Sequence, residues 1–282
     1  MIETGAGIKW LKDIVYGIGS SPVNHSQAQV QGRQLRMHIL IPENRARKLL
    51  PAIIWIHGGG WEAGNKEDGL YRSALLCDRG YVCASMEYRF SQEAVFPAQI
   101  EDCKCAVRFM RANAGEFGLD PDRIGVWGAS AGGHLVALLG TSGGVKELEG
   151  SGGSQQASSR VEAVCDWCGP TDFLNWKEIP EANKPAIEAV ITKLFGAAAE
   201  QKRELAVLAN PITHIKKNAP PFLIIHGDLD DLVPLNHSVI LDDALKKAGG
   251  RSELMVMKGC GHGFDESVIL PKIFDFFDKN LK

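Results

Sequence analysis

A short glycine-bounded segment constrains the fold of this chain more than any other part of its sequence. Residues 128–132 read Gly-Ala-Ser-Ala-Gly; they follow the apolar run 123–127, and a helical pattern begins with them. A serine between glycines at such a boundary predicts a tight turn from a strand into a helix, which pushes the hydroxyl into a cleft. Ser130 is therefore the leading candidate for a nucleophile.

Short apolar segments alternate with helix-like stretches along the rest of the chain. The strand-like segments are 35–41, 52–57, 81–86, 123–127, 161–167, 222–226 and 253–257. The helix-like stretches, several with apolar spacing near 3.6, are 67–79, 97–114, 131–139, 185–195, 200–209, 236–247 and 265–280. This alternation predicts an α/β fold with a mostly parallel sheet covered by helices. The first strands, near 13–16 and 35–41, are expected to form an antiparallel edge.

The length and apolar content favour one domain. With 282 residues, of which 45% are hydrophobic, the chain can bury a full core, and we expect a single domain over 1–282. The stretch 143–159 is dense in Gly, Ser and Gln and is expected to be a mobile surface loop. The segment 170–221 interrupts the alternation of strand-like and helix-like segments, and it is expected to form a small cap.

Charge and composition argue against several function classes. The formal net charge is −3, with no basic stripe, so we expect no nucleic-acid partner. No stretch has the length and apolarity of a membrane span, and the start lacks a leader pattern. We expect a cytoplasmic protein, or an exported one if a leader was removed. The pair Cys165 and Cys168 lacks further ligands for zinc, so no metal site is expected. No cofactor and no protein partner are expected either.

The best candidate for a base is a histidine on a glycine-rich loop near the end of the chain. A serine hydroxyl is a weak nucleophile at neutral pH, so Ser130 needs a histidine to accept its proton and a carboxylate to orient that histidine. His262 lies between glycines in the segment 259–264, after the last strand-like segment. For the other histidines a structural or surface role is the stronger interpretation.

Three aspartates compete for the role of the orienting carboxylate. Asp228, Asp230 and Asp231 all follow the apolar segment 222–226, and the carboxyl ends of strands are where open α/β sheets gather functional groups. Aspartates in such loops commonly cap turns, so at least two of the three are expected to be structural.

A glycine triplet supplies candidate donors for a negatively charged oxygen. Residues 57–61 read His-Gly-Gly-Gly-Trp at the end of a strand-like segment. Glycine lets the backbone approach a substrate closely, and two of these amides with that of Ala131 could surround an oxyanion. The alternative is that the triplet only forms a sharp turn. His57 is expected to brace this loop and not to act as the base.

Taken in order, these segments resemble esterases of the α/β-hydrolase superfamily. The segments are 57–61, 120–134, 226–234 and 261–263, and the likeness is to the hormone-sensitive-lipase-like and the acetyl-xylan or feruloyl esterase-like groups. The resemblance implies an eight-stranded α/β-hydrolase sheet. It also implies that Asp230 is the triad acid, with Asp231 as the fallback, and that Gly59 and Gly60 donate to the oxyanion.

The function that this resemblance implies is a serine carboxylesterase acting through Ser130, His262 and Asp230. We expect short-acyl esters as substrates, and carbohydrate acetyl or feruloyl esters are natural candidates by resemblance alone. Trp61 and Phe264 flank the motifs and are candidates for lining the substrate pocket, with a plain core role as the alternative. Two rival hypotheses are an arylformamidase or other amidase, and an inactive binding module of the same fold.

Overall fold

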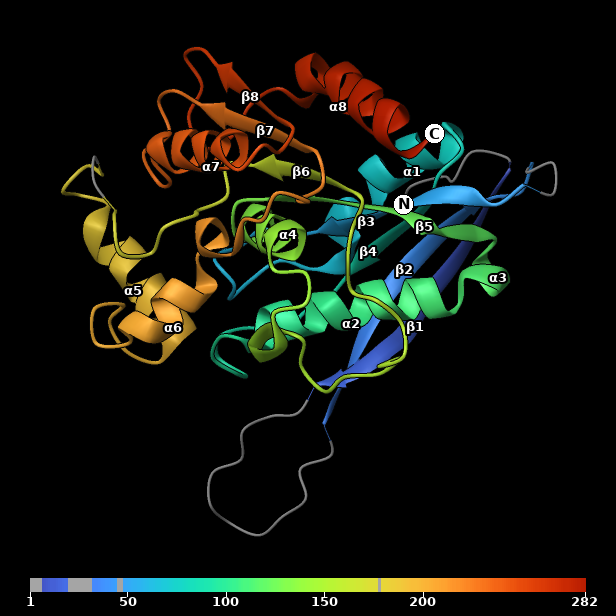
Figure 1. The fold of residues 1–282 in the computed structure, drawn as a ribbon, viewed down its shortest axis with the longest axis horizontal. Coiled ribbons are helices and arrows are strands. Elements are labelled where there is room, and N and C mark those ends of the chain that lie inside the picture. The colour runs from blue at the N-terminus through green and yellow to red at the C-terminus, as the bar shows by residue number, and fades with distance from the viewer. Residues whose placement is uncertain (1–6, 20–31, 45–47, 177–178) are drawn as a thin grey trace, which may run out of the picture.

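Eight strands form one sheet in the order β1-β2-β4-β3-β5-β6-β7-β8 (Figure 1). The computed structural model describes residues 7–19, 32–44, 48–176 and 179–282. The strands are β1 Ile8–Gly19, β2 Arg33–Pro42, β3 Leu50–Ile56, β4 Val82–Met86, β5 Leu119–Ala129, β6 Ala163–Trp167, β7 Phe222–Gly227 and β8 Ser252–Met257. Strand β2 pairs antiparallel with β1 and β4, and the remaining pairs are parallel. The predicted mostly parallel eight-stranded sheet with an antiparallel edge is confirmed.

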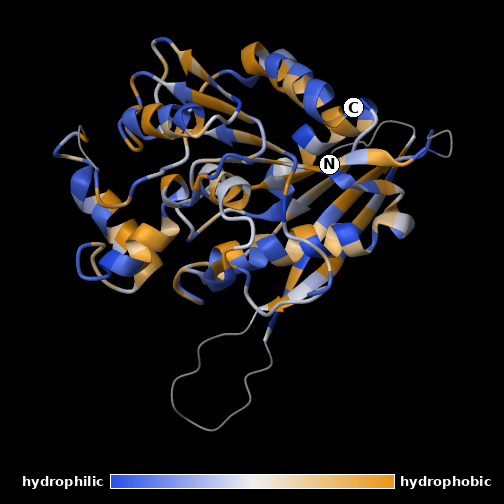
Figure 2. Ribbon diagram, in the orientation of Figure 1, coloured by the Kyte–Doolittle hydropathy of each residue, from blue (hydrophilic) through white to orange (hydrophobic). Residues whose placement is uncertain are grey.

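Helices cover both faces of the sheet. They are α1 Leu70–Asp78, α2 Ala98–Ala112, α3 Ala114–Phe117, α4 Ala131–Thr141, α5 Lys184–Phe195, α6 Arg203–Ala209, α7 Asn236–Lys247 and α8 Glu266–Leu281. Hydrophilic and hydrophobic residues lie side by side on these helices (Figure 2), as expected for helices with one face on a sheet. Among the described residues, none of them combines the length and the apolar character that crossing a membrane requires.

The central strands are buried on both faces, which explains why their sequences are continuously apolar. In β5, Val126 packs in the cluster that includes residues of α2, α4 and α7, while Trp127 packs in the one that includes residues of α1 and α8. Successive side chains of a strand point to opposite faces, so each face receives its own core. A rigid sheet of this kind fixes the position of the loops at its carboxyl edge.

The stretch 143–159 differs from the expected mobile surface loop. Residues Lys146–Leu148 form a 3-10 turn in which Leu148 is buried. Glu149 accepts hydrogen bonds from Lys104 at 2.8 Å and from Ser159 at 2.8 Å. Arg108 and Arg111 of α2 also donate to backbone carbonyls of the stretch. The low apolar content of the stretch did not indicate these contacts, because most of them are polar.

Candidate active site

Ser130 occupies the tight turn between β5 and α4. Its backbone has φ 56° and ψ −119°, a left-handed conformation that is uncommon for residues other than glycine. The Ser130 amide donates to the carbonyl of Trp167 at 2.8 Å, and its carbonyl accepts from the amide of His134 at 2.9 Å. Strain of this kind persists only where the surroundings hold it in place, and it is commonly found at functional sites.

Glycines make this turn possible because backbone segments pass too close for a side chain. A Cβ at Gly132 would lie 2.1 Å from the carbonyl oxygen of Ile56, and one at Gly128 would lie 2.4 Å from that of Gly132. A Cβ at Gly58 would lie 2.8 Å from the carbonyl oxygen of Ala129. The glycines on both sides of Ser130 therefore let the turn pack directly against β3 and the loop that follows it.

A methyl group at position 132 is expected to disrupt this packing. Gly132→Ala should lower the free energy of unfolding by about 3 kcal/mol or more, since the clash is with backbone. Gly115→Ala in α3 is the matched control, because among the described residues nothing outside its own helix lies within 4 Å of the added Cβ. The control should be as stable as wild type or more so, because alanine favours a helix. Urea denaturation measures both, and equal stabilities would contradict the expectation.

The structure brings Ser130, His262 and Asp230 together from three separate loops. The His262 Nε2 atom lies 2.9 Å from Ser130 Oγ, and His262 Nδ1 lies 2.7 Å from Asp230 Oδ2. The Asp230 side chain is fully buried, while that of His262 is 22% exposed. The three side chains therefore form a continuous hydrogen-bonded chain that runs from the interior to an accessible hydroxyl.

The other two aspartates of this loop lie elsewhere. Asp228 Oδ1 accepts the amide of Gly259 at 2.6 Å, which ties the β7 loop to the loop that carries His262. The side chain of Asp231 is exposed, and its backbone carbonyl accepts from Asn183 at 3.0 Å. Among the three candidates, Asp230 is the one within hydrogen-bond distance of His262.

A second histidine, His226, contacts the same carboxylate, although the sequence favours only a structural or surface role for it. His226 Nε2 lies 3.1 Å from Asp230 Oδ2, and His226 Nδ1 lies 2.6 Å from Ser238 Oγ. Asp230 Oδ1 accepts the amides of Leu232 at 3.0 Å and Val233 at 2.9 Å. Burial alone would raise the pKa of Asp230, but the hydrogen bonds from His226 and His262 hold it well below its usual value. Asp230 is therefore ionised at neutral pH.

Cys168 is another residue that sequence reasoning missed at this site. It has a left-handed φ of 43°, and its buried thiol lies 3.7 Å from the carbonyl oxygen of His262. Burial raises the pKa of the Cys168 thiol, which therefore stays protonated at neutral pH. The donor atoms of Cys168, Asp230 and His262 lie within 4.8 Å of one another, so these side chains could also hold a metal ion. In the sequence, Cys165 and Cys168 suggest only an incomplete zinc site, and nothing there indicates that Cys168 lies next to His262.

The environment of His262 should shift the pH dependence of any reaction in which it is the base. Burial lowers the pKa of His262, but the hydrogen bond to the ionised Asp230 outweighs it and raises the pKa above the ordinary 6.5. A base acts only when unprotonated, so kcat/KM should rise with pH through a midpoint above 6.5. A profile of kcat/KM against pH measures this midpoint. A value at or below that of a free histidine would contradict the expectation.

Of the candidate oxyanion donors, Gly60 lines the same cavity as Ser130, and Ala131 follows Ser130 in the chain. Gly59 and Gly60 have φ values of 104° and 59°, and the carbonyl of Gly59 closes a turn by accepting the amides of Glu62 and Ala63 at 3.0 Å. Among the described residues, the amides of Gly59 and Gly60 donate to no other group. Ala131 begins α4, where amides have no partner within the helix.

His57 holds the glycine loop and does not reach Ser130. Its Nδ1 atom lies 2.7 Å from the carbonyl oxygen of Gly58, and its ring stacks on that of Tyr88 with 4.4 Å between centroids. Burial lowers the pKa of His57, so the ring is neutral. These contacts place it as a brace for the loop.

A cavity of about 200 Å³ opens beside Ser130, and we call it the serine cavity. Its lining is mostly apolar and comprises Gly60, Trp61, Ser130, Pro170, Trp176, Ala186, Ile187, Val190, Ile191, Leu232, Val233 and His262. Trp61 is part of this wall, and its Nε1 donates to His134 Nδ1 at 3.2 Å. Phe264 does not line the cavity; its ring packs against Trp167, with centroids 5.7 Å apart. Of the two aromatic candidates, the structure brings only Trp61 to the site.

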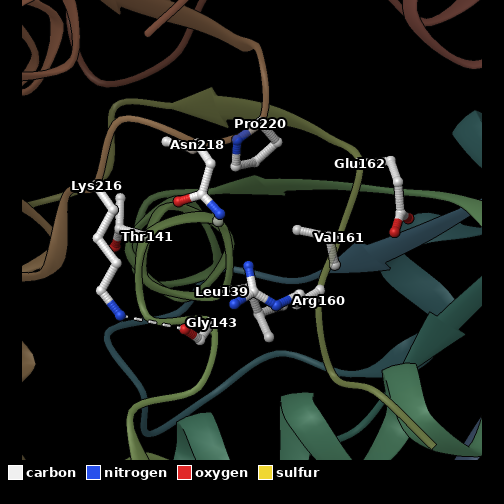
Figure 3. A pocket seen from close by; sticks show the side chains of 11 residues that line it. Leu139, Thr141, Gly143, Arg160, Val161, Glu162, Lys216, Asn218 and Pro220 are labelled. Carbon is white, nitrogen blue, oxygen red and sulfur yellow. Dashed lines mark hydrogen bonds between the residues drawn. The ribbon is translucent and has the colours of Figure 1, made fainter. Parts of the chain in front are cut away.

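A different cavity lies at the opposite edge of the sheet, where β6 and β7 begin (Figure 3). Its volume is about 280 Å³, and its lining includes Arg160, Glu162 and Pro220. Lys216, an exposed residue at its rim, contacts the carbonyl oxygen of Gly143 at 3.5 Å. None of the residues of the hydrogen-bonded chain line it, so the candidate chemistry belongs to the serine cavity.

The chain is similar in sequence to a known protein family and to named esterases. Residues 37–245 match the BD-FAE family. Esterase LipQ of Mycobacterium tuberculosis is 31% identical over 80% of this chain and 52% of its own length. The chain thus spans about half the length of this relative, and about the same share of LipC from the same organism, which is 32% identical over 77% of this chain and 54% of its own.

Solved structures extend the likeness over nearly the whole chain. A truncated form of a carbohydrate esterase from gut microbiota has a TM-score of 0.80 at 30% identity, and the match covers 96% of this chain and 95% of that one. Esterase Est2 of Thermogutta terrifontis with bound butyrate has a TM-score of 0.75 at 25% identity, covering 98% of this chain and 94% of that one.

Proposed function

The chain belongs to the BD-FAE family of α/β-hydrolase esterases, and from that premise we propose that it is a serine carboxylesterase that hydrolyses short-acyl esters. The observation that carries the proposal is the hydrogen-bonded chain Ser130, His262 and Asp230, which ends at a hydroxyl on a strained turn. That arrangement is what nucleophilic catalysis by a serine requires.

In the proposed mechanism, Ser130 Oγ attacks the ester carbonyl carbon while His262 Nε2 takes the hydroxyl proton. Asp230 holds the imidazole in the tautomer that leaves Nε2 free to accept, and it stabilises the imidazolium that forms. The amides of Gly59, Gly60 and Ala131 donate to the carbonyl oxygen as it becomes negative. His262 then returns the proton to the departing alcohol, which leaves an acyl group on Ser130. A water molecule, deprotonated by His262, then adds to the acyl carbon; the bond to Ser130 Oγ breaks, His262 returns the proton to Oγ, and the acid is released.

The size and chemistry of the serine cavity support a short acyl group. A volume of about 200 Å³ with a mostly apolar lining suits a small hydrocarbon portion and not a long chain. Helix α5, from the segment between β6 and β7, supplies one wall, so we propose that the segment 170–221 acts as a small cap. A carbohydrate ester is a natural candidate because the structural neighbour with the TM-score of 0.80 is described as a carbohydrate esterase.

The experiment that tests the proposal is hydrolysis of p-nitrophenyl esters from acetate to palmitate. A feruloyl ester, an acetylated xylo-oligosaccharide and N-formylkynurenine are assayed alongside. We expect kcat/KM to be highest for the short acyl chains. Activity on N-formylkynurenine alone would favour the arylformamidase hypothesis. A folded protein inert on every substrate would contradict the esterase and favour a binding module.

A further inference from the structure

A second, larger cavity adjoins the serine cavity. Its volume is about 600 Å³, and its lining includes Phe173, Trp176, Ile179, Ile187, Ile191 and Thr192. Three side chains, Trp176, Ile187 and Ile191, line both cavities. The two spaces are therefore neighbours that share a wall formed by these three side chains.

Helix α5 forms one side of that wall, and its periodicity explains the arrangement. Ala186 and Val190, four residues apart, face only the serine cavity, while Glu188 and Thr192 face only the second cavity. Ile187 and Ile191 form the stripe between them and touch both spaces. Residues four apart lie on one face of a helix, so α5 presents a separate stripe to each cavity. Figure 1 shows α5 away from the centre of the sheet.

Trp176 forms the other side of the wall and is held by ring packing. Its ring lies 4.6 Å from that of His237 and 6.3 Å from that of Phe173, measured between centroids. The shielded indole Nε1 atom has no hydrogen-bond partner among the described residues. Removing this ring would open the wall and break no hydrogen bond of the indole, so its cost to stability comes from lost packing.

We propose that Trp176, with Ile187 and Ile191, sets the acyl-length limit of this enzyme by closing the serine cavity off from a latent acyl subsite in the second cavity. The inference rests on the proposed esterase function. The acyl carbon is bonded to Ser130 in the intermediate, and the alkyl chain beyond it runs into the apolar serine cavity until it meets this wall. The alcohol leaves on the side of His262, which is partly exposed.

The test is the acyl-chain profile of Trp176→Ala. The ratio of kcat/KM for p-nitrophenyl octanoate to that for acetate should rise about tenfold or more over wild type, because the longer chain gains buried apolar area in the second cavity. Ile187→Ala should shift the ratio in the same direction from the helix side of the wall. It serves as the second variant if Trp176→Ala folds poorly.

Two further variants test whether a changed ratio comes from access to the second cavity or from a nonspecific disturbance of the active site. Ile179→Ala enlarges only the second cavity and should leave the ratio at the wild-type value. Adding Thr192→Phe to Trp176→Ala fills the second cavity from α5 and should return the ratio toward wild type. An unchanged ratio in Trp176→Ala and Ile187→Ala would overturn the proposal. So would a shift seen only when the alcohol is lengthened in a series of alkyl acetates.

Calorimetric binding of decanoate keeps this inference distinct from the esterase proposal. Trp176→Ala should bind decanoate about tenfold more tightly than wild type, and the double variant should not, whether or not either protein turns over esters. An inactive wild type with this binding pattern would reject the esterase alone. An active wild type in which Trp176→Ala gains neither decanoate affinity nor octanoate activity would reject the subsite alone.

Discussion

Replacing Ser130 with alanine is expected to reduce kcat on p-nitrophenyl acetate by about 10⁶-fold, the scale measured when the serine of another triad enzyme is removed. The variant lacks the atom that forms the acyl intermediate, and His262 has no proton to take from it. Donors of the oxyanion hole remain in place, so a residual rate above that of water is expected. Initial rates with freshly purified protein measure the loss.

Stability should not change with this substitution. Alanine and serine both carry a Cβ, so the left-handed backbone at position 130 is equally strained in both. The matched control is Ser142→Ala at the far end of α4, where among the described residues the buried hydroxyl has no partner. It should retain wild-type activity. If Ser130→Ala kept more than about 1% of the wild-type kcat, a different group would have to be the nucleophile.

The parts of this site that could be predicted from the sequence are those that a local segment specifies. The turn around Ser130 needs small residues at fixed offsets, because backbone from β3 and from the loop after it passes within van der Waals distance. Residues 128–132 meet this requirement, so the turn can be recognised from five consecutive residues. The alternation of apolar segments likewise predicts the sheet, because strands buried on both faces need continuous apolar sequence.

The contacts around the carboxylate could not be predicted in this way. His226 lies in β7 and reads as an ordinary buried strand residue until the loop folds back and brings Asp230 within 3.1 Å. Cys168 directly follows β6, and its thiol contacts the carbonyl of His262, 94 positions away in the sequence. Trp176 lines the same wall as Ile187 and Ile191 of α5, which its position in the sequence does not indicate. The prediction that Phe264 lines the substrate pocket was wrong. Phe264 is close to His262 in the sequence, but that closeness does not determine where its ring points, and the ring packs against Trp167.

The choice among the aspartates is the sharpest remaining test of the site. Asp230→Asn should lower kcat by about 10⁴-fold, as for the equivalent change in a serine protease. The amide oxygen can still accept the backbone amides of Leu232 and Val233, so the loop is kept. A neutral side chain, however, no longer stabilises the imidazolium, and an amide N–H facing His262 Nδ1 favours the wrong tautomer.

Asp231→Asn is the matched control because it changes the neighbouring residue, whose side chain is exposed, in the same way. It should leave kcat within about twofold of wild type, since a charge in solvent contributes little. Loss of the negative charge at Asp230 should also lower the pKa of His262, because the hydrogen bond to Asp230 raises that pKa. The rising limb of the kcat/KM profile should therefore move to lower pH in Asp230→Asn alone. If Asp231→Asn instead lost activity and shifted the profile, the exposed carboxylate would be the triad acid, and the loop would have to rearrange on substrate binding.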